Sequence, residues 1–302
     1  MTTALGFSHH QSINAAIEEI WLQIKPKLDL SNSSLLILYT NTPTHTHNEY
    51  VNQLKKTAPD STIVGCSTSG ISDPNSNEYT TAIVAFQSSD TTFKSSVTSH
   101  LSKKDTTQTK NLINDLKQSP PPHSILLFTD GLKPGVVQLL NQSNNQKTAF
   151  YGCGAGDHNQ FSESAQYYEK QSVQDSAVAV GISGQLKIFS TSIQPIQQIT
   201  ENTSITKATS NVIQEINHQP ALKYLQPIFG SEIITGPTDQ IINKLITYPI
   251  QLTDPKTNQI TIATPTSFKN GEIHTNFSIP QNASIAITTS SRRMIIQQTN
   301  DK

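Results

Sequence analysis

Residues 62–70 read Thr-Ile-Val-Gly-Cys-Ser-Thr-Ser-Gly, so a Gly-Cys pair comes directly after a short apolar run. Residues 148–157 read Thr-Ala-Phe-Tyr-Gly-Cys-Gly-Ala-Gly-Asp and repeat that order. A short unbroken apolar run between polar flanks is typical of a strand that is buried on both faces. Each stretch therefore predicts a buried strand that ends in a glycine-containing loop.

The sequence around the two stretches repeats as well. The first copy is predicted to consist of a strand over 35–39, a helix over 46–57, the strand at 62–64 and a strand over 79–87. The second is predicted to consist of a strand over 125–128, a helix over 134–143, the strand at 148–151 and a strand over 176–182. Because parallel strands need helical crossovers of one hand, this order predicts an α/β fold. We expect a mixed sheet with pseudo-duplicated strand-helix-strand halves.

The remaining pattern extends this plan at both ends. Apolar spacing predicts helices over 13–24 and 107–117. After residue 184 we expect a strand over 185–192 that pairs with 176–182, then two short strands or a helix within 203–216. Further helices are predicted over 220–229 and 238–245, and short strands over 246–253, 258–264, 272–278, 284–289 and 293–298. We therefore predict an α/β domain over 1–198 and a smaller β-rich domain over 199–302.

The composition of the chain argues against several classes of protein. A chain of 302 residues suits two domains. Its 21 basic and 22 acidic residues give a net charge of −1, which argues against a nucleic-acid or polybasic membrane-surface protein. We expect no membrane insertion, because no run approaches 18 apolar residues, and no signal peptide at the start. Two cysteines do not make a disulfide framework, so the cytoplasm is the expected location.

The two glycine-containing stretches are the predicted ligand-binding site. Backbone N–H groups and the hydroxyls of Ser67, Thr68 and Ser69 are predicted to hold a carboxylate, and Asp157 to pair with an ammonium group. This predicts a small polar or zwitterionic ligand. The predicted site comprises Gly65, Cys66, Ser67, Thr68, Ser69, Gly152, Cys153, Gly154, Gly156 and Asp157. The alternative is that both stretches are tight turns and that Asp157 caps a helix.

The sequence gives less support to nucleotide binding or to cysteine chemistry. The second stretch lacks the glycine spacing of a dinucleotide fingerprint, and no Walker-type Gly-Lys-Ser or Gly-Lys-Thr occurs. Cys66 or Cys153 could be a nucleophile, or the two could form a redox pair if they were adjacent in space. Sequence does not determine that adjacency, so this alternative stays open. We expect a binding protein without catalytic residues.

Histidines could bind a metal or a cofactor. His158 directly follows the second stretch, so it could contact a ligand, coordinate haem iron, or be a surface loop residue. The pairs His9-His10 and His45-x-His47 lack a supporting Cys, Asp or Glu at ligand spacing. We predict that these four histidines are exposed polar residues.

Together these stretches resemble the FIST family of sensory modules in bacterial and archaeal signalling proteins. The resemblance rests on Leu35–Tyr39, Ile63–Gly70, Tyr151–Asp157 and Ser176–Ile182, and the segment 204–222 is similar to the start of the family's C-terminal half. It implies a FIST N-like domain over 1–198 and a shortened FIST C-like domain over 199–302.

The resemblance also implies a function. It implies sensing of a small ligand, such as an amino acid, rather than catalysis. Some similar proteins bind haem, sense nitric oxide and regulate a histidine kinase, and His158 would be the haem ligand here. Since no kinase, cyclase or receptor domain is recognisable in the chain, we expect the signal to pass to a separate partner protein.

Overall fold

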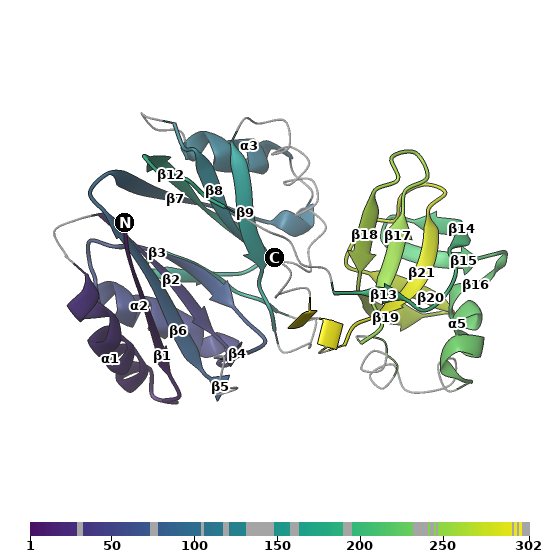
Figure 1. Ribbon diagram of the computed structural model, residues 1–302, viewed down its shortest axis with the longest axis horizontal. Coiled ribbons are helices and arrows are strands. Elements are labelled where there is room, and N and C mark those ends of the chain that lie inside the picture. Colours follow the sequence, from purple (N-terminus) through teal and green to yellow (C-terminus); the bar gives the residue numbers. More distant parts are fainter. Residues whose placement is uncertain are drawn as a thin grey trace. The chain divides into compact units, whose positions relative to one another are not determined.

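The computed structural model divides into two compact units, Met1–Lys187 and Ile188–Lys302 (Figure 1). Each unit is described by itself. The structure describes residues 1–28, 33–72, 78–103, 106–116, 121–130, 148–157, 163–189, 195–231, 241, 245, 247–291, 293–294 and 296–297.

The first unit contains two mixed sheets. The first sheet has the strand order β1-β6-β2-β3-β10-β11 and the second has the order β7-β12-β8-β9. The strands of the first sheet are β1 (Thr2–Ser8), β2 (Ser33–Thr40), β3 (Thr62–Ser67), β6 (Thr81–Ser88), β10 (Gln166–Tyr168) and β11 (Gln171–Val173). Those of the second are β7 (Thr91–Ser99), β8 (Ser124–Thr129), β9 (Ala149–Gly154) and β12 (Ser176–Gly184), and β4 (Ile71–Ser72) and β5 (Glu78–Tyr79) form a separate pair.

The two sheets repeat one pairing pattern, which confirms the predicted pseudo-duplication. In each, a parallel pair, β2 with β3 or β8 with β9, is flanked by an antiparallel strand, β6 or β12. The outermost strands β1 and β7 then pair antiparallel with β6 and β12. The two halves form two separate sheets rather than one continuous sheet. Each half has its own strand, β1 or β7, paired with its antiparallel strand, β6 or β12.

Apolar side chains join the layers of this unit. Ile37 and Val64 of the first sheet pack with Phe128 and Val180 of the second. The helices α1 (Ile13–Ile24) and α2 (His47–Thr57) cover the outer face of the first sheet, and α3 (Thr106–Asp115) covers that of the second (Figure 1). Because the central strands are covered on both faces, they need the unbroken apolar runs seen in the sequence.

Short 3-10 turns complete the helical elements of the first unit. They are η1 (Lys25–Lys27), η2 (Thr44–Thr46) and η3 (Leu101–Lys103). The first of them carries the chain through Pro26 after α1 ends, since proline is tolerated near the start of a helical turn.

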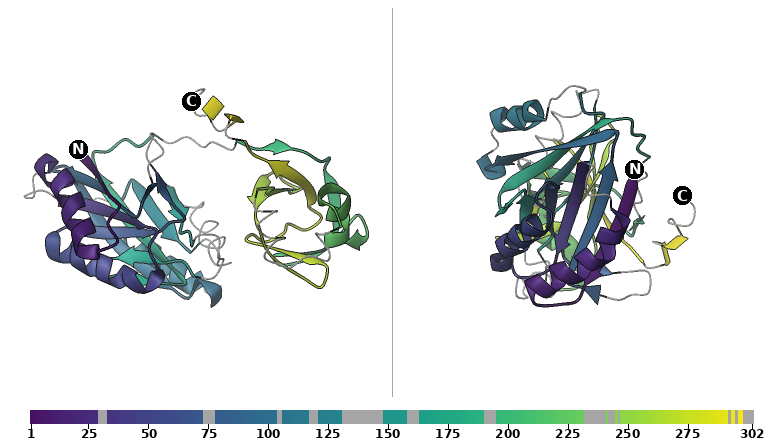
Figure 2. Two further views of the ribbon diagram at one scale, coloured as in Figure 1. Left: turned by 90° about the horizontal axis from the view of Figure 1, so that it is seen from below. Right: turned by 90° about the vertical axis from the view of Figure 1, so that its left-hand side faces the viewer.

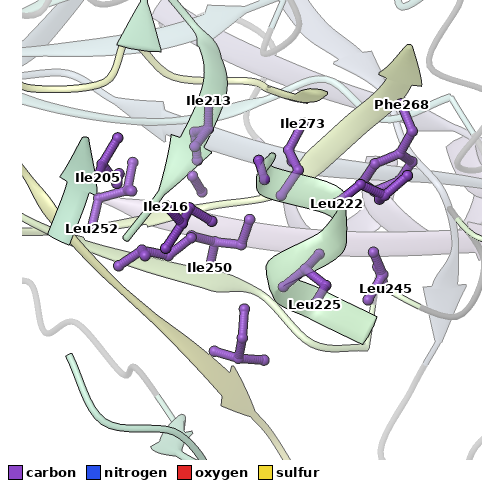
Figure 3. Packing of buried hydrophobic residues seen from close by; sticks show 14 of the residues in the cluster. Ile205, Ile213, Ile216, Leu222, Leu225, Leu245, Ile250, Leu252, Phe268 and Ile273 are labelled. Atoms are coloured by element: carbon purple, nitrogen blue, oxygen red, sulfur yellow. The ribbon is translucent and has the colours of Figure 1, made fainter. Parts of the chain in front are cut away.

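The second unit contains a nine-stranded antiparallel sheet and the helix α5 (Ala221–Phe229). Figure 2 shows the strands curving around a common interior, and Figure 3 shows the apolar side chains that fill it. Its strands are β13 (Gln197–Gln198), β14 (Thr203–Thr209), β15 (Val212–Ile216), β16 (Gln219–Pro220), β17 (Ile250–Thr253), β18 (Ile260–Ala263), β19 (Pro265–Lys269), β20 (Glu272–Thr275) and β21 (Ser284–Thr289). The predicted β-rich C-terminal region is thereby confirmed.

Some predicted elements differ from the structure. The predicted strand over 185–192 is wrong for its described part, because β12 itself continues to Gly184 and residues 185–189 are irregular. The predicted strand over 293–298 is also wrong, since its described residues are helical. Segment 203–216 forms two strands rather than a helix. The predicted helix at 134–143 lies outside the described residues, as does most of that at 238–245.

Both predicted Gly-Cys loops begin later than expected. Gly65 and Cys66 lie within β3, and Gly152, Cys153 and Gly154 lie within β9. Glycine at these positions accommodates a close approach of the neighbouring strand and does not end the strand. The assignment of 1–198 and 199–302 to the two halves of the family stays a prediction.

Among the described residues, no helix is both long enough and apolar enough to cross a membrane.

Candidate functional site

The candidate site lies where the two parallel strand pairs end. Loops that follow the carboxyl ends of parallel strands meet at one edge of a sheet. The first residue after β3, Thr68, donates its N–H to the Thr40 carbonyl at 3.0 Å. At the equivalent place in the other half, Ala155 donates to the Thr129 carbonyl at 2.8 Å. Both loops therefore begin with the same backbone hydrogen bond, which is made to the last residue of the neighbouring parallel strand.

The two loops are in direct contact with each other. The Gly156 N–H donates to the Ser67 carbonyl at 2.9 Å. A Cβ atom at Gly156 would lie only 2.8 Å from the Ser69 backbone nitrogen, which is closer than real Cβ contacts occur. Position 156 therefore has to be glycine for the loops to pack in this way.

A cavity of about 450 Å³ lies beside this contact. Four of the predicted site residues line it, two from each loop: Ser67, Thr68, Gly156 and Asp157. Its remaining lining residues are Asn41, Thr42, Pro43, Thr44, His45, His47 and Glu163. Gly65, Cys66, Ser69, Gly152, Cys153 and Gly154 are not among the lining residues, and His158 lies outside the described residues.

The segment after β2 supplies most of the wall that sequence analysis missed. It runs from Asn41 to His47 and includes η2 and the first residue of α2. Its position was a usable signal, because β2 is parallel to β3 and the segment follows its carboxyl end. Sequence analysis assigned the ligand-binding site to the glycine-containing stretches alone and predicted both histidines here to be exposed.

That prediction is wrong for His47, which is 1% exposed. Its Nε2 lies 2.8 Å from the Thr42 carbonyl oxygen. Burial lowers the pKa of His47, so the ring is neutral at pH 7 and Nε2 carries the proton that this carbonyl accepts. Nδ1 is then a hydrogen-bond acceptor, and it is buried without a hydrogen-bond partner within the described part of the chain. The ring also packs edge-on against Tyr167.

Three amides of the predicted carboxylate-binding nest, those of Ser67, Thr68 and Gly156, donate to backbone carbonyls. The N–H groups of Ser67 and Thr68 donate to the carbonyls of Ala165 and Thr40, at 2.8 and 3.0 Å. That of Gly156 donates to Ser67. The Ser67 hydroxyl accepts from the Ala165 N–H at 2.9 Å. These donors hold the loops together and do not point at a bound anion.

The charged groups of the lining are acidic. Asp157 and Glu163 contribute carboxylates, and the described lining residues include no lysine or arginine. Gln174 donates to a Glu163 carboxylate oxygen at 3.1 Å, which fixes that side chain at the rim. Carboxylates bind cationic donors more strongly than neutral ones. The lining therefore favours a ligand with an ammonium group over an anion.

These residues do not fit haem. A haem macrocycle is broad and mostly apolar, whereas asparagine, three threonines, a serine and two carboxylates form this wall. The carboxylates would also repel the haem propionates. The Nε2 of His47 is bound to the Thr42 carbonyl, and the haem ligand expected from sequence, His158, lies outside the described residues.

The structure also brings the two free cysteines into contact. The Sγ atoms of Cys66 and Cys153 lie 3.9 Å apart, although 87 residues separate them in the sequence. Cys66 is buried and Cys153 is exposed. The adjacency that sequence left open is therefore present.

Fold and site together define the class: a duplicated α/β domain in which loops from both halves border one polar cavity. The family model of the FIST N domain matches residues 34–219, and the chain belongs to this family of sensory domains. The resemblance inferred from sequence is thereby confirmed.

Solved structures of cyanuric acid hydrolases show a distant similarity. One is 7% identical, with a TM-score of 0.28, and the match covers 60% of this chain and 69% of that one. The enzyme from A. caulinodans is 10% identical, with a TM-score of 0.27 and coverage of 61% and 72%. Similarity at this level identifies neither a reaction nor a substrate. No curated protein sequence matches the chain.

Proposed function

We propose that the first unit binds a small polar ligand that carries an ammonium group, and that this binding is the signal the protein senses. The observation that carries the proposal is the cavity of about 450 Å³ at the contact between the two loops. Its volume lies within the range of small-molecule sites in proteins, roughly 300–1,000 Å³. Membership of a sensory family supports sensing as the purpose of such a site.

The lining supports the chemical class of the ligand. Asp157 and Glu163 are suited to an ammonium group, and Asn41 and Thr42 offer neutral hydrogen-bonding groups. The neutral His47 adds an acceptor for an N–H or O–H donor. An amino acid combines an ammonium group with further polar atoms and is therefore the ligand class we favour.

The output belongs to the same proposal. We infer that a separate signalling partner, such as a histidine kinase, reads the ligand-bound state in the cytoplasm. Family membership supports a role in signalling, and ligand binding at the junction of two loops offers a way to change the surface around them. Co-purification of the chain with a kinase encoded beside it would test this part.

The binding site is tested with the purified chain and a panel of amino acids and simple amines. A ligand that binds only the native state raises the melting temperature. We expect at least one amine to do so. Asp157→Asn should weaken its binding by about 1–3 kcal/mol, the scale of a hydrogen bond to a charged group.

Glu18→Gln is the matched control, because Glu18 is an exposed carboxylate of α1 outside the cavity lining. It should bind the same amine as the unmodified protein does. The site would be refuted if Asp157→Asn and Glu163→Gln both kept full affinity while remaining folded. Loss of stability with unchanged affinity would instead assign Asp157 a structural role.

A further inference from the structure

Cys66 and Cys153 occupy equivalent positions in the two halves of the repeat. Cys66 pairs with Tyr39 across β3 and β2, and Cys153 pairs with Phe128 across β9 and β8. The Tyr39 and Phe128 rings meet edge to face at 6.3 Å, so the two pairs face each other between the sheets. The repeat thus places two thiols in contact at 3.9 Å.

The surroundings of the two thiols differ. Strand β3 lies between β2 and β10, and Cys66 is 1% exposed. Strand β9 is the last strand of its sheet, and Cys153 is exposed. Only one half supplies a hydroxyl beside the thiols, because Tyr39 has Phe128 as its counterpart. The tyrosine hydroxyl favours the thiolate form of Cys153 and so lowers the pKa of that thiol.

Hydrogen bonding makes the exposed thiol the more acidic of the two. The contact with the Cys66 thiol lowers the pKa of Cys153 against the opposing effect of partial burial, and the nearby Tyr39 hydroxyl lowers it further. The pKa of Cys66 is raised by the same contact with Cys153 and by burial. Thiolate is the nucleophilic form of cysteine, so Cys153 is the thiol that reacts first.

We propose that Cys153 and Cys66 form a peroxide-reactive dithiol site, in which Cys153 is the attacking thiol and Cys66 the resolving thiol. The substrate class is hydrogen peroxide or a small organic hydroperoxide. This site is distinct from the cavity, whose lining includes neither cysteine.

The reaction balances with peroxide as the oxidant. The Cys153 sulfur attacks one peroxide oxygen, the O–O bond breaks, and the departing hydroxide takes a proton and leaves as water. Cys153 is then a sulfenic acid. The Cys66 sulfur attacks the sulfenic sulfur, and the hydroxyl group departs with the Cys66 proton as a second water. Two thiols become one disulfide while hydrogen peroxide is reduced to two waters, or an organic hydroperoxide to one alcohol and one water, and an added thiol reduces the disulfide by exchange.

The geometry needs only a small movement. The sulfur atoms must close from 3.9 Å to about 2.05 Å, the length of a disulfide bond. One end of the bond is on β9, which is the last described strand of its sheet. The bond would link the two halves just before the loops that border the cavity.

The experiment treats the reduced full-length chain with stoichiometric hydrogen peroxide. We expect loss of both thiols, a mass lower by about 2 Da, and recovery of both thiols with dithiothreitol. Peptide mapping of the unmodified protein should locate the bond between Cys66 and Cys153. Two free thiols after treatment, or a bond between two chains only, would overturn the proposal.

Single variants separate the two roles. Cys66→Ala should stop at a sulfenic acid on Cys153 that dimedone traps, while Cys153→Ala should lose the reaction with peroxide. Oxidation at Cys66 in the second variant at the unmodified rate would overturn the assigned order. Because a core variant can fail to fold, Cys66→Ser is made beside Cys66→Ala, and the peptide map of the unmodified chain stands without either.

Tyr39→Phe tests the positioning role of the hydroxyl. Removing this hydroxyl should raise the pKa of Cys153, so the pH profile of the oxidation rate should move to higher pH. A purely structural role for Tyr39 would change stability and leave this profile in place, and that result would remove Tyr39 from the proposal.

Discussion

At the scale of single residues, two glycines occupy equivalent positions in the two halves of the repeat. Gly65 and Gly152 have φ angles of +147° and +156°, a region that favours glycine. A Cβ atom at Gly65 would lie 1.9 Å from the Leu38 carbonyl oxygen, and one at Gly152 would lie 1.8 Å from that of Leu127. The same close strand approach is therefore present in both halves, immediately before each cysteine.

This predicts that Gly65→Ala destabilises the protein strongly. The clash is with backbone on a buried strand, so neither strand can move aside cheaply, and we expect a loss of about 3 kcal/mol or more. Urea unfolding measures the change. The control is Gly70→Ala, because a Cβ atom there meets nothing within 4 Å. Equal stabilities of the two variants would contradict the role given to Gly65.

At the scale of elements, one side chain connects three layers. Glu169 lies in the turn between β10 and β11. It accepts hydrogen bonds from Lys55 of α2 and from Ser95 of β7, both at 2.8 Å. Lys55 also donates to the Ser61 carbonyl at 2.7 Å. A helix, the first sheet and the second sheet therefore meet at one carboxylate.

We predict that Glu169→Ala lowers the free energy of unfolding by about 1–3 kcal/mol. The Lys55 side chain is 16% exposed, so its ammonium group would lose its carboxylate partner in a mostly buried place. Thermal and urea unfolding measure the change. Glu18→Ala on the exposed face of α1 should stay within about 0.5 kcal/mol of the unmodified protein. If Glu169→Ala matched that control, Glu169 would not connect the layers.

At the scale of the whole molecule, each compact unit has its own core. Three apolar clusters lie entirely within residues 1–187. A fourth lies entirely within the second unit and joins α5 to the curved sheet. A unit that buries its own apolar side chains has the basis for folding alone.

We therefore predict that residues 1–187, expressed alone, unfold in one cooperative transition. The reason is that all members of its three apolar clusters come from this chain segment. Circular dichroism during heating, compared with the full chain, measures it. A fragment without a cooperative transition would show that the second unit is required for the first to fold.

Sequence analysis identified only some of the residues that line the cavity. Sequence located Ser67, Thr68, Gly156 and Asp157 because glycine and small polar residues directly after an apolar run stand out locally. It missed Asn41, His47 and Glu163, which carry no local signal. They reach the cavity through the parallel pairing of β2 with β3 and through a separate connection before β10, and pairing is a property of the fold.

Three edge strands of the first unit, β1, β7 and β11, were not predicted. The central strands β2, β3, β8 and β12 were recognised because coverage on both faces demands continuous apolar residues. Strands β1, β7 and β11 lie at sheet edges and contain many polar residues, so their sequences resemble loops. Hydrogen bonding to a neighbour that is distant in sequence, rather than an apolar run, makes them strands.

The sequence by itself determined the duplicated α/β plan, the β-rich C-terminal part and the family. These depend on local patterns, namely apolar runs, helical spacing and repeated Gly-Cys pairs. The tertiary structure alone decided that the halves form two facing sheets. It also decided that their loops share one cavity and that two cysteines 87 residues apart touch. Contacts between distant segments arise from packing one apolar face against another, and a linear pattern does not specify which faces meet.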